Sequence, residues 1–349
     1  TLLSSIGLPN KDYLIKGFIV PQRKRLSPAQ GAIRHAVREV LAANTKPGQK
    51  LLVAVSGGAD SLALASATLF ESKKLQLQVA TVTIDHGLQK VSAKVTEQTL
   101  EKLHKIGITE AWSKKVKVGT KGGPEAAART ARYEALESIR IESKSDFIVL
   151  GHTANDQAET VLLGLTRGSG SRSLSGMSGR SEKLLRPLLS IERATTEQFC
   201  KDEKISPWQD PQNRDLKFLR VRIRKVVLPF LEKQLGKGIF SNLIRTSSQL
   251  QEDDQYLSAV AAKAFRKIAK TSLNSVTLGE QDLLKLPEAI RNRVIKSAID
   301  YFDVESSRTH VLAVADLVLN WHGQKPLALP GVRVERKGKT ITLKATQEK

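Results

Sequence analysis

Cysteines and long apolar segments are the scarcest features of this 349-residue sequence. Cys200 is the single cysteine, which excludes an intramolecular disulfide, a zinc site of several thiolates and an iron–sulfur site held by the chain's own cysteines. No run of about 18 apolar residues occurs, so we expect no membrane-spanning helix. The sequence therefore predicts a soluble protein of a reducing compartment, the cytoplasm.

Two common nucleotide-binding signatures are missing as well. The sequence contains neither the Gly-x-x-x-x-Gly-Lys-Ser/Thr loop of P-loop NTPases nor the Gly-x-Gly-x-x-Gly turn of dinucleotide-binding dehydrogenases. The sequence therefore gives little support for a P-loop NTPase or a dinucleotide-binding dehydrogenase.

Acidic residues are few in comparison with basic ones. The chain has 35 Asp and Glu residues against 56 Lys and Arg residues, which gives a formal net charge of +21. This excess indicates a polyanionic partner, with nucleic acid ahead of a membrane surface. A solvated basic surface without a partner is the alternative, and charge alone also allows a basic ribosomal or chromatin protein.

Strand-like and helix-like segments alternate through the first half of the chain. Short apolar runs of strand length are each followed by a turn and by a longer segment with helical spacing. This alternation predicts an α/β domain whose parallel sheet is covered on both faces and binds ligands at the carboxyl ends of its strands. The predicted strands are residues 51–55, 79–84, 112–118 and 147–151, and the predicted helices are residues 27–44, 59–74, 92–106, 124–141 and 155–166.

The ends of the chain and its second half are organised differently. The first helix signal is Ser27 followed by Pro28, so we expect residues 1–25 to be a disordered extension without the apolar core of a signal peptide. The Gly/Ser-rich residues 167–179 are a candidate mobile lid or substrate loop, with a flexible linker as the alternative. We expect an α/β domain at residues 26–230 and a smaller, mainly helical domain at 231–349, with helical segments at 240–270, 280–301 and 309–321 and a hairpin at 332–336 and 340–344.

A glycine-rich loop follows the first predicted strand and begins the next helix. Backbone N–H groups and the helix dipole converge there on a point where an anion is stabilised, and glycines allow a close approach. Serine hydroxyls add donors, and a carboxylate suits a phosphate-bound Mg²⁺ rather than a bare phosphate. The loop therefore predicts a Mg²⁺–nucleotide site, with an ordinary Gly-Gly turn as the alternative. Its residues are Ser56, Gly57, Gly58, Ala59, Asp60 and Ser61.

Two further polar segments follow strands of the same predicted sheet. Asp85-His86-Gly87-Leu88 comes after the second strand and by itself is typical of a turn. The segment from His152 to Thr160 places Asp156 and Glu159 on the first turns of a helix, where two carboxylates can hold Mg²⁺ or a cationic substrate. The alternative is that these acids cap the helix, which does not account for the nearby histidine.

A set of charged residues also shares one face of a predicted helix. Glu125, Arg129 and Arg132 are spaced by four and three residues, and Tyr133 follows them. A surface ion-pair ladder is the default interpretation of this spacing.

Taken in order, these segments resemble the tRNA(Ile)-lysidine synthetase family, which are bacterial PP-loop ATP pyrophosphatases with an adenine-nucleotide α-hydrolase-like fold. The loop alone resembles the signature of all PP-loop enzymes, which cleave ATP between the α and β phosphates, whereas the ordered set is specific. The resemblance runs from about Leu26 to the carboxyl end. The sequence departs from it at two positions, because family members often have Asp where Asn155 stands and Asn where Val221 stands. The resemblance also covers residues 56–61, 85–88, 125–133, 152–160, 167–170, 186–189, 210–215, 220–224 and 228–229.

The resemblance implies a carbon–nitrogen ligase that uses ATP and Mg²⁺. ATP would adenylate the C2 oxygen of the wobble cytidine in an isoleucine tRNA with a CAU anticodon, and the ε-amine of free lysine would displace AMP. The basic second domain would hold the tRNA, and no membrane or obligate protein partner is implied. The target base must leave its stack, so we expect a pocket between the two domains.

The same resemblance suggests roles for individual residues. The loop residues 56–61 would hold the pyrophosphate, with Asp60 as the Mg²⁺ contact. A free lysine ammonium, with a pKa near ~10.4, must be positioned and deprotonated. Asp85 would bind the nucleotide, Arg132 would face the adenylate, and Arg222 and Arg224 would contact phosphates of ATP or tRNA. Asp156 and Glu159 would bind the lysine ammonium, and His152 or one of those two carboxylates would accept its proton.

Other functions explain fewer of these features. PP-loop enzymes that thiolate tRNA typically rely on paired cysteines, and Cys200 stands alone. PP-loop amidating enzymes need no basic tRNA domain. A catalytically silent RNA-binding protein would explain the charge but would leave Asp60, Asp156 and Glu159 without a purpose.

Overall fold

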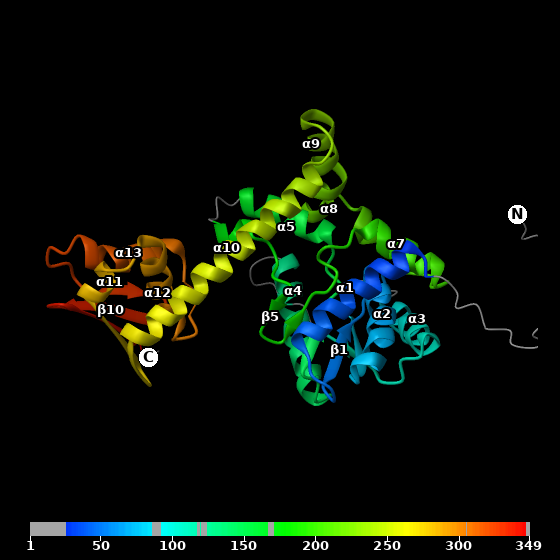
Figure 1. The fold of residues 1–349 in the computed structure, drawn as a ribbon, viewed down its shortest axis with the longest axis horizontal. Coiled ribbons are helices and arrows are strands. Elements are labelled where there is room, and N and C mark those ends of the chain that lie inside the picture. Colours follow the sequence, from blue (N-terminus) through cyan, green and yellow to red (C-terminus); the bar gives the residue numbers. More distant parts are fainter. Residues whose placement is uncertain are drawn as a thin grey trace, which may run out of the picture.

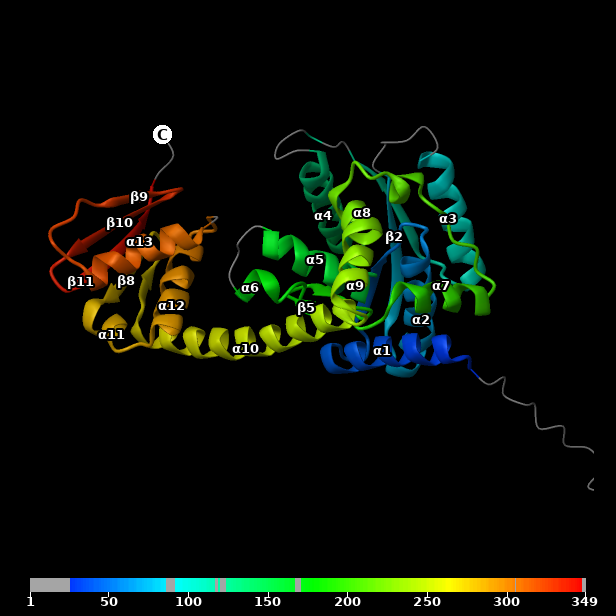
Figure 2. The same ribbon diagram turned by 90° about the horizontal axis from the view of Figure 1, so that it is seen from above.

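The computed structural model describes residues 26–85, 92–116, 119, 124–166, 171–304 and 306–346. Within this part of the chain two lobes are joined by one long helix, α10 (Ile239–Ile268), which is yellow-green in Figures 1 and 2. The expected extension at 1–25, residues 86–88 and the first residues of the expected lid, 167–170, lie outside the described residues.

The first lobe is built on a six-stranded, mostly parallel sheet, as the alternation of segments predicted. Strands β1, β2, β3, β4 and β6 run parallel, and only β5 at one edge is antiparallel. In spatial order the strands are β3 (Ala111–Lys115), β2 (Gln78–Asp85), β1 (Lys50–Ala54), β4 (Phe147–Val149), β6 (Leu184–Leu185) and β5 (Arg180–Ser181). The first strand thus has neighbours on both sides, and the chain leaves it at the point where ligands of open α/β sheets bind.

Helices cover both faces of this sheet because successive side chains of its central strand point in opposite directions. Leu51 and Val53 belong to a core with α1 (Pro28–Asn44), α2 (Ala59–Leu75) and α7 (Arg193–Asp202). Leu52 and Ala54 belong to the opposite core, which includes Leu136 of α4 (Pro124–Glu142). The expected double covering of the sheet is confirmed.

The described part of the first lobe contains further helical elements. They are α3 (Ser92–Ile106), α5 (Ala154–Thr166), α6 (Ser171–Leu174), the 3-10 turn η1 (Pro211–Arg214), α8 (Leu219–Arg222), the one-turn π-helix η2 (Ile223–Val227) and α9 (Leu228–Leu235). No helix in the described ranges combines the length and apolar character that crossing a bilayer requires.

The second lobe contains more strands than the sequence indicated. Its helices are α11 (Glu280–Leu284), α12 (Glu288–Asp300) and α13 (Arg308–Leu319), and together with α10 they hold more of its residues than the strands do. The predicted hairpin forms, and it belongs to an antiparallel sheet of five strands. In order these are β7 (Lys270–Ser272), β8 (Ser275–Gly279), β11 (Thr340–Ala345), β10 (Val332–Lys337) and β9 (Leu327–Leu329).

Helix α10 belongs to the cores of both lobes. Phe240 and Leu243 near its start pack against a cluster that includes Ala158 of α5, whereas Leu257 and Ala261 near its end lie in the core of the second lobe. The expected domain boundary at residue 230 falls inside α9, and the two apolar cores divide within α10.

Candidate active site

The loop at Ser56–Ser61 connects β1 to α2 and is held closed by its own hydroxyl groups. The backbone N–H of Ser56 donates to Oγ of Ser61 at 3.1 Å, and this hydroxyl donates to the carbonyl of Gly58 at 3.0 Å. Gly58 is the N-cap residue of α2, and in the described part of the chain no side chain caps this helix end. The first amides of α2 therefore keep the arrangement that binds anions.

Gly57 occupies a position of this loop that only glycine can adopt without strain. Its φ of +84° lies in the left-handed region, which residues with a Cβ atom rarely adopt. A Cβ atom at this position would lie 2.5 Å from Oγ1 of Thr99, a buried side chain on α3. The loop therefore fits closely against α3 because this residue has no side chain.

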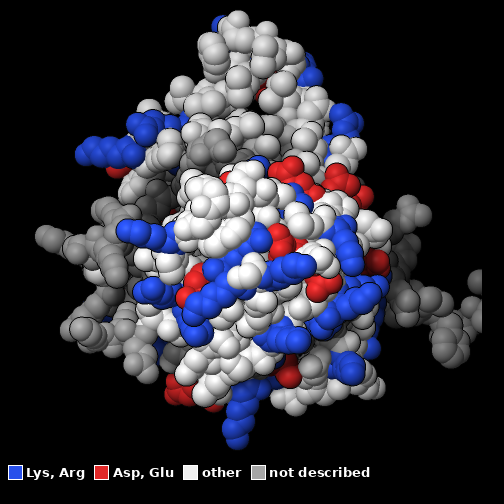
Figure 3. All heavy atoms as spheres, turned by 90° about the vertical axis from the view of Figure 1, so that its left-hand side faces the viewer, with Lys and Arg blue, Asp and Glu red and all other residues white. Residues whose placement is uncertain are grey.

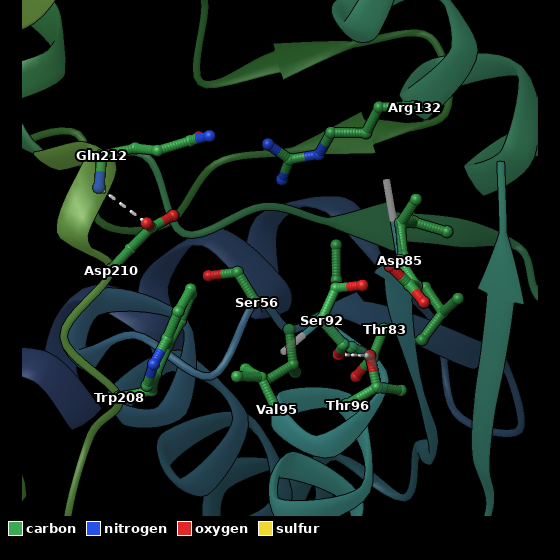
Figure 4. Close-up of a pocket in the computed structure, with 14 residues that line it drawn as sticks. Ser56, Thr83, Asp85, Ser92, Val95, Thr96, Arg132, Trp208, Asp210 and Gln212 are labelled. Atoms are coloured by element: carbon green, nitrogen blue, oxygen red, sulfur yellow. Dashed lines mark hydrogen bonds between the residues drawn. The ribbon is translucent and has the colours of Figure 1, made fainter. Parts of the chain in front are cut away.

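A cavity of about 160 Å³ lies beside the loop at the carboxyl ends of β1 and β2. The backbone N–H of Trp208 donates to the carbonyl of Gly57 at 2.9 Å, which ties one wall of the cavity to the loop. Figure 4 shows Arg132 and Gln212 above the space, with Asp85 and Trp208 on its two sides. The volume is below the ~300–1,000 Å³ of pockets for drug-sized ligands and suits one flat ring.

Arg132 is the cationic group of this cavity. Its guanidinium makes no hydrogen bond or ion pair to another residue that the structure describes, and burial lowers its pKa. An arginine remains charged in proteins despite such a shift. The cavity therefore offers an unpaired positive charge beside the anion-binding loop.

The acids of the loop and of α5 are joined by an arginine that the sequence did not single out. Nε of Arg193 lies 3.1 Å from Oδ2 of Asp60, and its Nη2 lies 3.2 Å from Oδ1 of Asp156. The other oxygen of Asp60 accepts a hydrogen bond from Thr196. Burial opposes the charge of Arg193, but the two carboxylates raise its pKa.

Glu159 is enclosed by two further arginines. Its side chain is 1% exposed, and its Oε1 accepts a hydrogen bond of 2.7 Å from Nε of Arg224. Nη1 of Arg220 lies 3.6 Å from Oε2, which has no hydrogen-bond partner among the described residues. The carboxylate is thus neutralised by charge but keeps one oxygen without a hydrogen bond.

Asp156 has a structural and an electrostatic contact at the same time. Its Oδ2 accepts hydrogen bonds from the backbone N–H and the hydroxyl of Thr153, at 2.8 Å and 2.9 Å, as a helix-capping acid does. Its Oδ1 faces Arg193. Burial alone would raise the pKa of Asp156, but Arg193 and the bonds from Thr153 lower it. The capping interpretation of this acid is therefore confirmed, while its role toward Mg²⁺ or a cationic substrate stays a prediction.

His152 lies beside the same acid in a strongly basic environment. Burial, aided by Arg132, Arg186 and Arg129, lowers the pKa of His152 to about 3, although Asp156 opposes this shift. Its Nδ1 is buried without a hydrogen-bond partner in the described part of the chain. The imidazole is therefore neutral at physiological pH.

The structure thus brings most of the expected residues to two adjoining places. Ser56 of the loop, Asp85 and Arg132 line the cavity. The acid cluster with its arginines contains Asp60, His152, Asp156, Glu159 and Arg224. Arg222 is exposed, and its side chain has no hydrogen bond or ion pair to the described residues. The side chain of Glu125 lies outside the described part, and Arg129 contacts the ring of Tyr133 rather than an acid.

Arg193, Thr196 and Arg220 were missed as members of this cluster. One signal was available for Arg220, because it lies four residues before Arg224 and therefore shares a helix face with it, while Arg222 points elsewhere. Arg193 and Thr196 belong to no motif in the sequence, and only the packing of α7 against α2 brings them to Asp60.

The donors at the loop fit Mg²⁺ only together with a nucleotide. No group of three or more His, Cys, Asp or Glu side chains in the described ranges could hold a metal ion. Mg²⁺ in nucleotide sites is held by one or two carboxylates together with substrate phosphates, and Asp60 supplies one carboxylate at the loop. Each oxygen of Asp60 already accepts one hydrogen bond, from Arg193 or Thr196, and keeps a second lone pair for an ion.

Comparison with known protein families gives matches in both lobes. Residues 30–231 match the PP-loop domain family, and residues 281–340 match the TilS substrate-binding domain. A tRNA(Ile)-lysidine synthase of Leifsonia xyli subsp. xyli is 45% identical over 298 residues, which cover 85% of this chain and 90% of the relative. A tRNA(Ile)-lysidine synthase of Thermobifida fusca is 41% identical over 313 residues, which cover 89% of this chain and 95% of the relative.

A solved structure shows the same fold in an enzyme with a different site. The U34-tRNA thiolase NcsA from Methanococcus maripaludis, described with its [4Fe-4S] cluster, has a TM-score of 0.55 and 20% sequence identity. The match covers 64% of this chain and 80% of the thiolase. Cys200, the single cysteine here, is buried, and burial raises its pKa to about 12. The fold is shared, and the sequence relatives and both matched domains show that this chain belongs to the tRNA(Ile)-lysidine synthase family.

Proposed function

We propose that this chain is an ATP-dependent tRNA(Ile)-lysidine synthase. It activates the C2 oxygen of the wobble cytidine in the CAU anticodon as an AMP adduct, and lysine then displaces AMP to form lysidine. One observation carries the proposal: the anion-binding loop and the buried acids of α5 adjoin each other, because Arg193 bridges Asp60 and Asp156.

The loop and the cavity serve the nucleotide. The open amino-terminal end of α2 and the Ser56 and Ser61 hydroxyls are placed to hold the departing pyrophosphate. The adjoining cavity has the size of a single base, and Arg132 lies where it can face the negative charge of the adenylate. Bound Mg²⁺ would supply charge neutralisation at the phosphates, with Asp60 as its protein contact.

Adenylation makes the acceptor base reactive toward an amine. A cytosine carbonyl is a poor electrophile and its oxygen is a poor leaving group, whereas the adenylate departs as AMP, a stable anion. This order of events requires ATP and the base to be held before the amine attacks.

The acid cluster serves the lysine. A free ammonium with a pKa near ~10.4 must lose a proton before it can attack. Oε2 of Glu159, which lacks a hydrogen bond among the described residues, is the contact that the ammonium would take, with Asp156 beside it. A pKa of about 3 makes His152 a weak proton acceptor, and Arg193 lowers the pKa of Asp156 as well, so His152, Asp156 and Glu159 all stay candidates for that step.

The second lobe serves the tRNA body. Lys and Arg side chains form a band across the end of the molecule that faces the viewer in Figure 3, on the side of the second lobe. Such a surface binds phosphates without regard to sequence and orients the RNA. Exposed basic residues of this lobe include Lys285, Arg308, Lys325, Arg333, Lys337, Lys339 and Lys344.

Product formation from defined substrates tests this function. The chain is incubated with ATP, Mg²⁺, lysine and an isoleucine tRNA with a CAU anticodon, and AMP, pyrophosphate and lysidine are measured. We expect lysidine only in the complete mixture, with AMP and pyrophosphate in equal amounts. AMP release that needs no tRNA, or tRNA modification that needs no lysine, would contradict the proposal.

The role of Glu159 is tested separately. Glu159→Gln removes the charge but keeps the shape, so we expect the KM for lysine to rise at least about tenfold while the KM for ATP stays constant. Glu142→Gln, at an exposed position at the end of α4, is the matched control. An unchanged KM for lysine and an unchanged kcat in Glu159→Gln would exclude this assignment.

A further inference from the structure

A short segment of the first lobe, Ser175–Met177, lies between α5 and α10, and we name it the strap. On one side Gln157 of α5 donates to the carbonyl of Met177 at 2.8 Å and accepts from its backbone N–H at 2.6 Å. On the other side Ser247 of α10 donates to the carbonyl of Ser175 at 2.7 Å, and Gln251 donates to the carbonyls of Ser175 and Met177. The strap therefore hydrogen-bonds both helices at once.

The middle residue of the strap shows how close this contact is. Gly176 has a φ of +68°, and a Cβ atom there would lie 2.6 Å from Oε1 of Gln157 and 2.9 Å from Oγ of Ser247. Any side chain at this position would have to displace the side chains of Gln157 and Ser247. Ser247 is 1% exposed and Ser175 is 6% exposed, so these bonds are also shielded from water.

The two ends of this connection have different tasks. Gln157 directly follows Asp156 on α5 and lies two residues before Glu159, so it sits on the helix that carries the acid cluster. Ser247 and Gln251 lie in the middle of α10, between the part that packs on the first lobe and the part in the core of the second. The strap is thus a second connection between α10 and the helix of the acids, beside the apolar packing of Phe240 and Leu243.

The length of α10 makes this direction important. The helix continues for 17 residues from Gln251 to Ile268, which corresponds to about 25 Å at the rise of an α-helix. A rotation of about 5° at the strap therefore moves the second lobe by about 2 Å. A shift of this size matters when one tRNA must reach both lobes at once.

We propose that Ser247 and Gln251 are specificity-determining positioning residues that make the enzyme prefer a whole tRNA to an isolated anticodon stem-loop. The inference rests on the proposed function and adds the selection of RNA size to it. A tRNA held by the second lobe presents its anticodon to the first lobe at a high effective concentration only when the span between the two sites is fixed. A stem-loop that contacts the first lobe alone gains nothing from this span.

The hydrogen bonds of the strap allow it to be loosened without unfolding the protein. In Gln251→Ala the carbonyl of Ser175 keeps its bond from Ser247, and that of Met177 keeps its bond from Gln157. The double variant Ser247→Ala with Gln251→Ala removes both donors to Ser175. Ser248→Ala and Gln249→Ala are matched controls, because both positions are exposed on the same turn of α10.

The first experiment compares two RNA substrates. For each variant kcat/KM is measured with full-length isoleucine tRNA and with its anticodon stem-loop, and the ratio of the two values is taken. We expect the ratio to fall about threefold in Gln251→Ala and at least about tenfold in the double variant, because effective concentration is lost. The value for the stem-loop, the KM for ATP and the ratios of both controls should stay constant.

The second experiment measures the span without any activity. Spin labels are attached at Glu39→Cys on α1 and Lys285→Cys after α11, two exposed positions, while the buried Cys200 stays unreacted. We expect a narrow distance distribution between the labels in the otherwise unchanged chain and in Gln249→Ala, and a clearly broader one in the double variant. Ser247→Thr, which keeps the hydroxyl, should retain the narrow distribution.

The outcomes separate this inference from the proposed function. If the unchanged chain makes no lysidine from either RNA, the proposed function fails, and the label distances still decide whether the strap sets the span. Equal losses with tRNA and stem-loop in the double variant would assign these residues to the stability of the first lobe and overturn the inference. An unchanged distance distribution in the double variant would overturn it as well.

Discussion

The two halves of the active site differ in how far their polar groups are already satisfied by the protein. On the nucleotide side, no side chain in the described ranges caps the amino-terminal end of α2, and Arg132 has no acidic partner there. On the acid side, Asp60, Asp156 and Glu159 are each bonded to an arginine. We call the nucleotide side open, because its donors have no acidic or capping partner among the described residues, and the acid side closed, because each acid is already paired with an arginine.

This difference indicates how each ligand must bind. A phosphate can bind the first amides of α2 without displacing a capping side chain, although the Ser61 hydroxyl must give up its bond to the carbonyl of Gly58 to donate to it. A cationic ligand at the acids must share carboxylates that are already paired with arginines, and Oε2 of Glu159 is the oxygen that has no hydrogen bond among the described residues. The arginines therefore hold the acid side chains in place, and Arg193 also lowers the pKa of Asp156.

Gly57→Ala should have the largest effect, because it removes the feature that keeps the nucleotide side open. The new Cβ would lie 2.5 Å from Thr99, and the φ of +84° would be strained in addition. We expect AMP formation to fall by about 100-fold to 1,000-fold, the loss typical of a displaced oxyanion donor. The measurement is the rate of AMP release with saturating tRNA and lysine.

Gly48→Ala is the control for this change. Gly48 has a similar φ of +86°, but nothing lies within 4 Å of its Cβ position, and it lies before β1, away from the loop. It should lose some stability and keep its activity. The double variant Gly57→Ala with Thr99→Ala should recover part of the lost rate, and a Gly57→Ala enzyme with normal activity would show that the loop is not closely fitted.

Arg193→Gln should have the next largest effect, because it opens the closed side. Asp60 and Asp156 would lose their shared counter-charge, so the free energy of unfolding should fall by about 3 kcal/mol. The pKa of Asp156 should rise toward its ordinary value, because Arg193 lowers it now. AMP formation should drop by roughly 10-fold to 100-fold as the loop acid loses its position.

Urea unfolding and AMP release measure these effects, with Lys201→Gln on the exposed side of α7 as the control. A stable and fully active Arg193→Gln enzyme would mean that the acid side is not held closed by this arginine. The comparison between the two sides would then lose its basis.

The same contrast explains which parts of the site the sequence could predict. The loop residues and the acids of α5 follow strands within a few positions, so local order along the chain places them at one edge of the sheet. Arg193 lies 133 positions from Asp60 in the sequence, and no local pattern connects them. The open side of the site depends on local sequence around one turn, whereas the closed side depends on contacts made only in the tertiary fold.

The fold itself divides in a similar way. Four strands of the first lobe, β1 to β4, were predicted within a few residues, whereas β5 and β6 have only two residues each and were not predicted. In the second lobe β7 and β9 have three residues each and lack both alternation and length, so only pairing with β8 and β10 makes them strands. Their existence depends on contacts that a local pattern does not contain.

His152 should contribute about 2 kcal/mol to the pH dependence of stability. Its pKa is about 3 in the folded protein and near ~6.5 when unfolded, so the unfolded chain binds more protons between these values. The folded state therefore loses stability as the pH falls below about 6.5. Between pH 7 and pH 5 the free energy of unfolding should decrease by about 2 kcal/mol less in His152→Gln than in the unchanged chain.

Tryptophan fluorescence in urea gives this measurement for the first lobe. Trp112 and Trp208 lie in that lobe and Trp321 in the second, so a Trp321→Phe background restricts the signal to the lobe of interest. Equal decreases in both proteins would mean that His152 is not held neutral by the arginines around it.

Arg222→Gln should have the smallest effect and marks the border of the closed side. Arg222 and Arg224 lie two residues apart in the chain, but only Arg224 is bonded to Glu159, while Arg222 is exposed. If Arg222 contacts an RNA phosphate, its loss should weaken tRNA binding by about 1 kcal/mol and reduce the slope of log Kd against log salt by about one. The KM for lysine should not change, whereas Arg224→Gln should raise it. Binding titrations at several salt concentrations and kinetics with varied lysine test both variants. An equal rise of the KM for lysine in the two variants would assign Arg222 to the closed side as well.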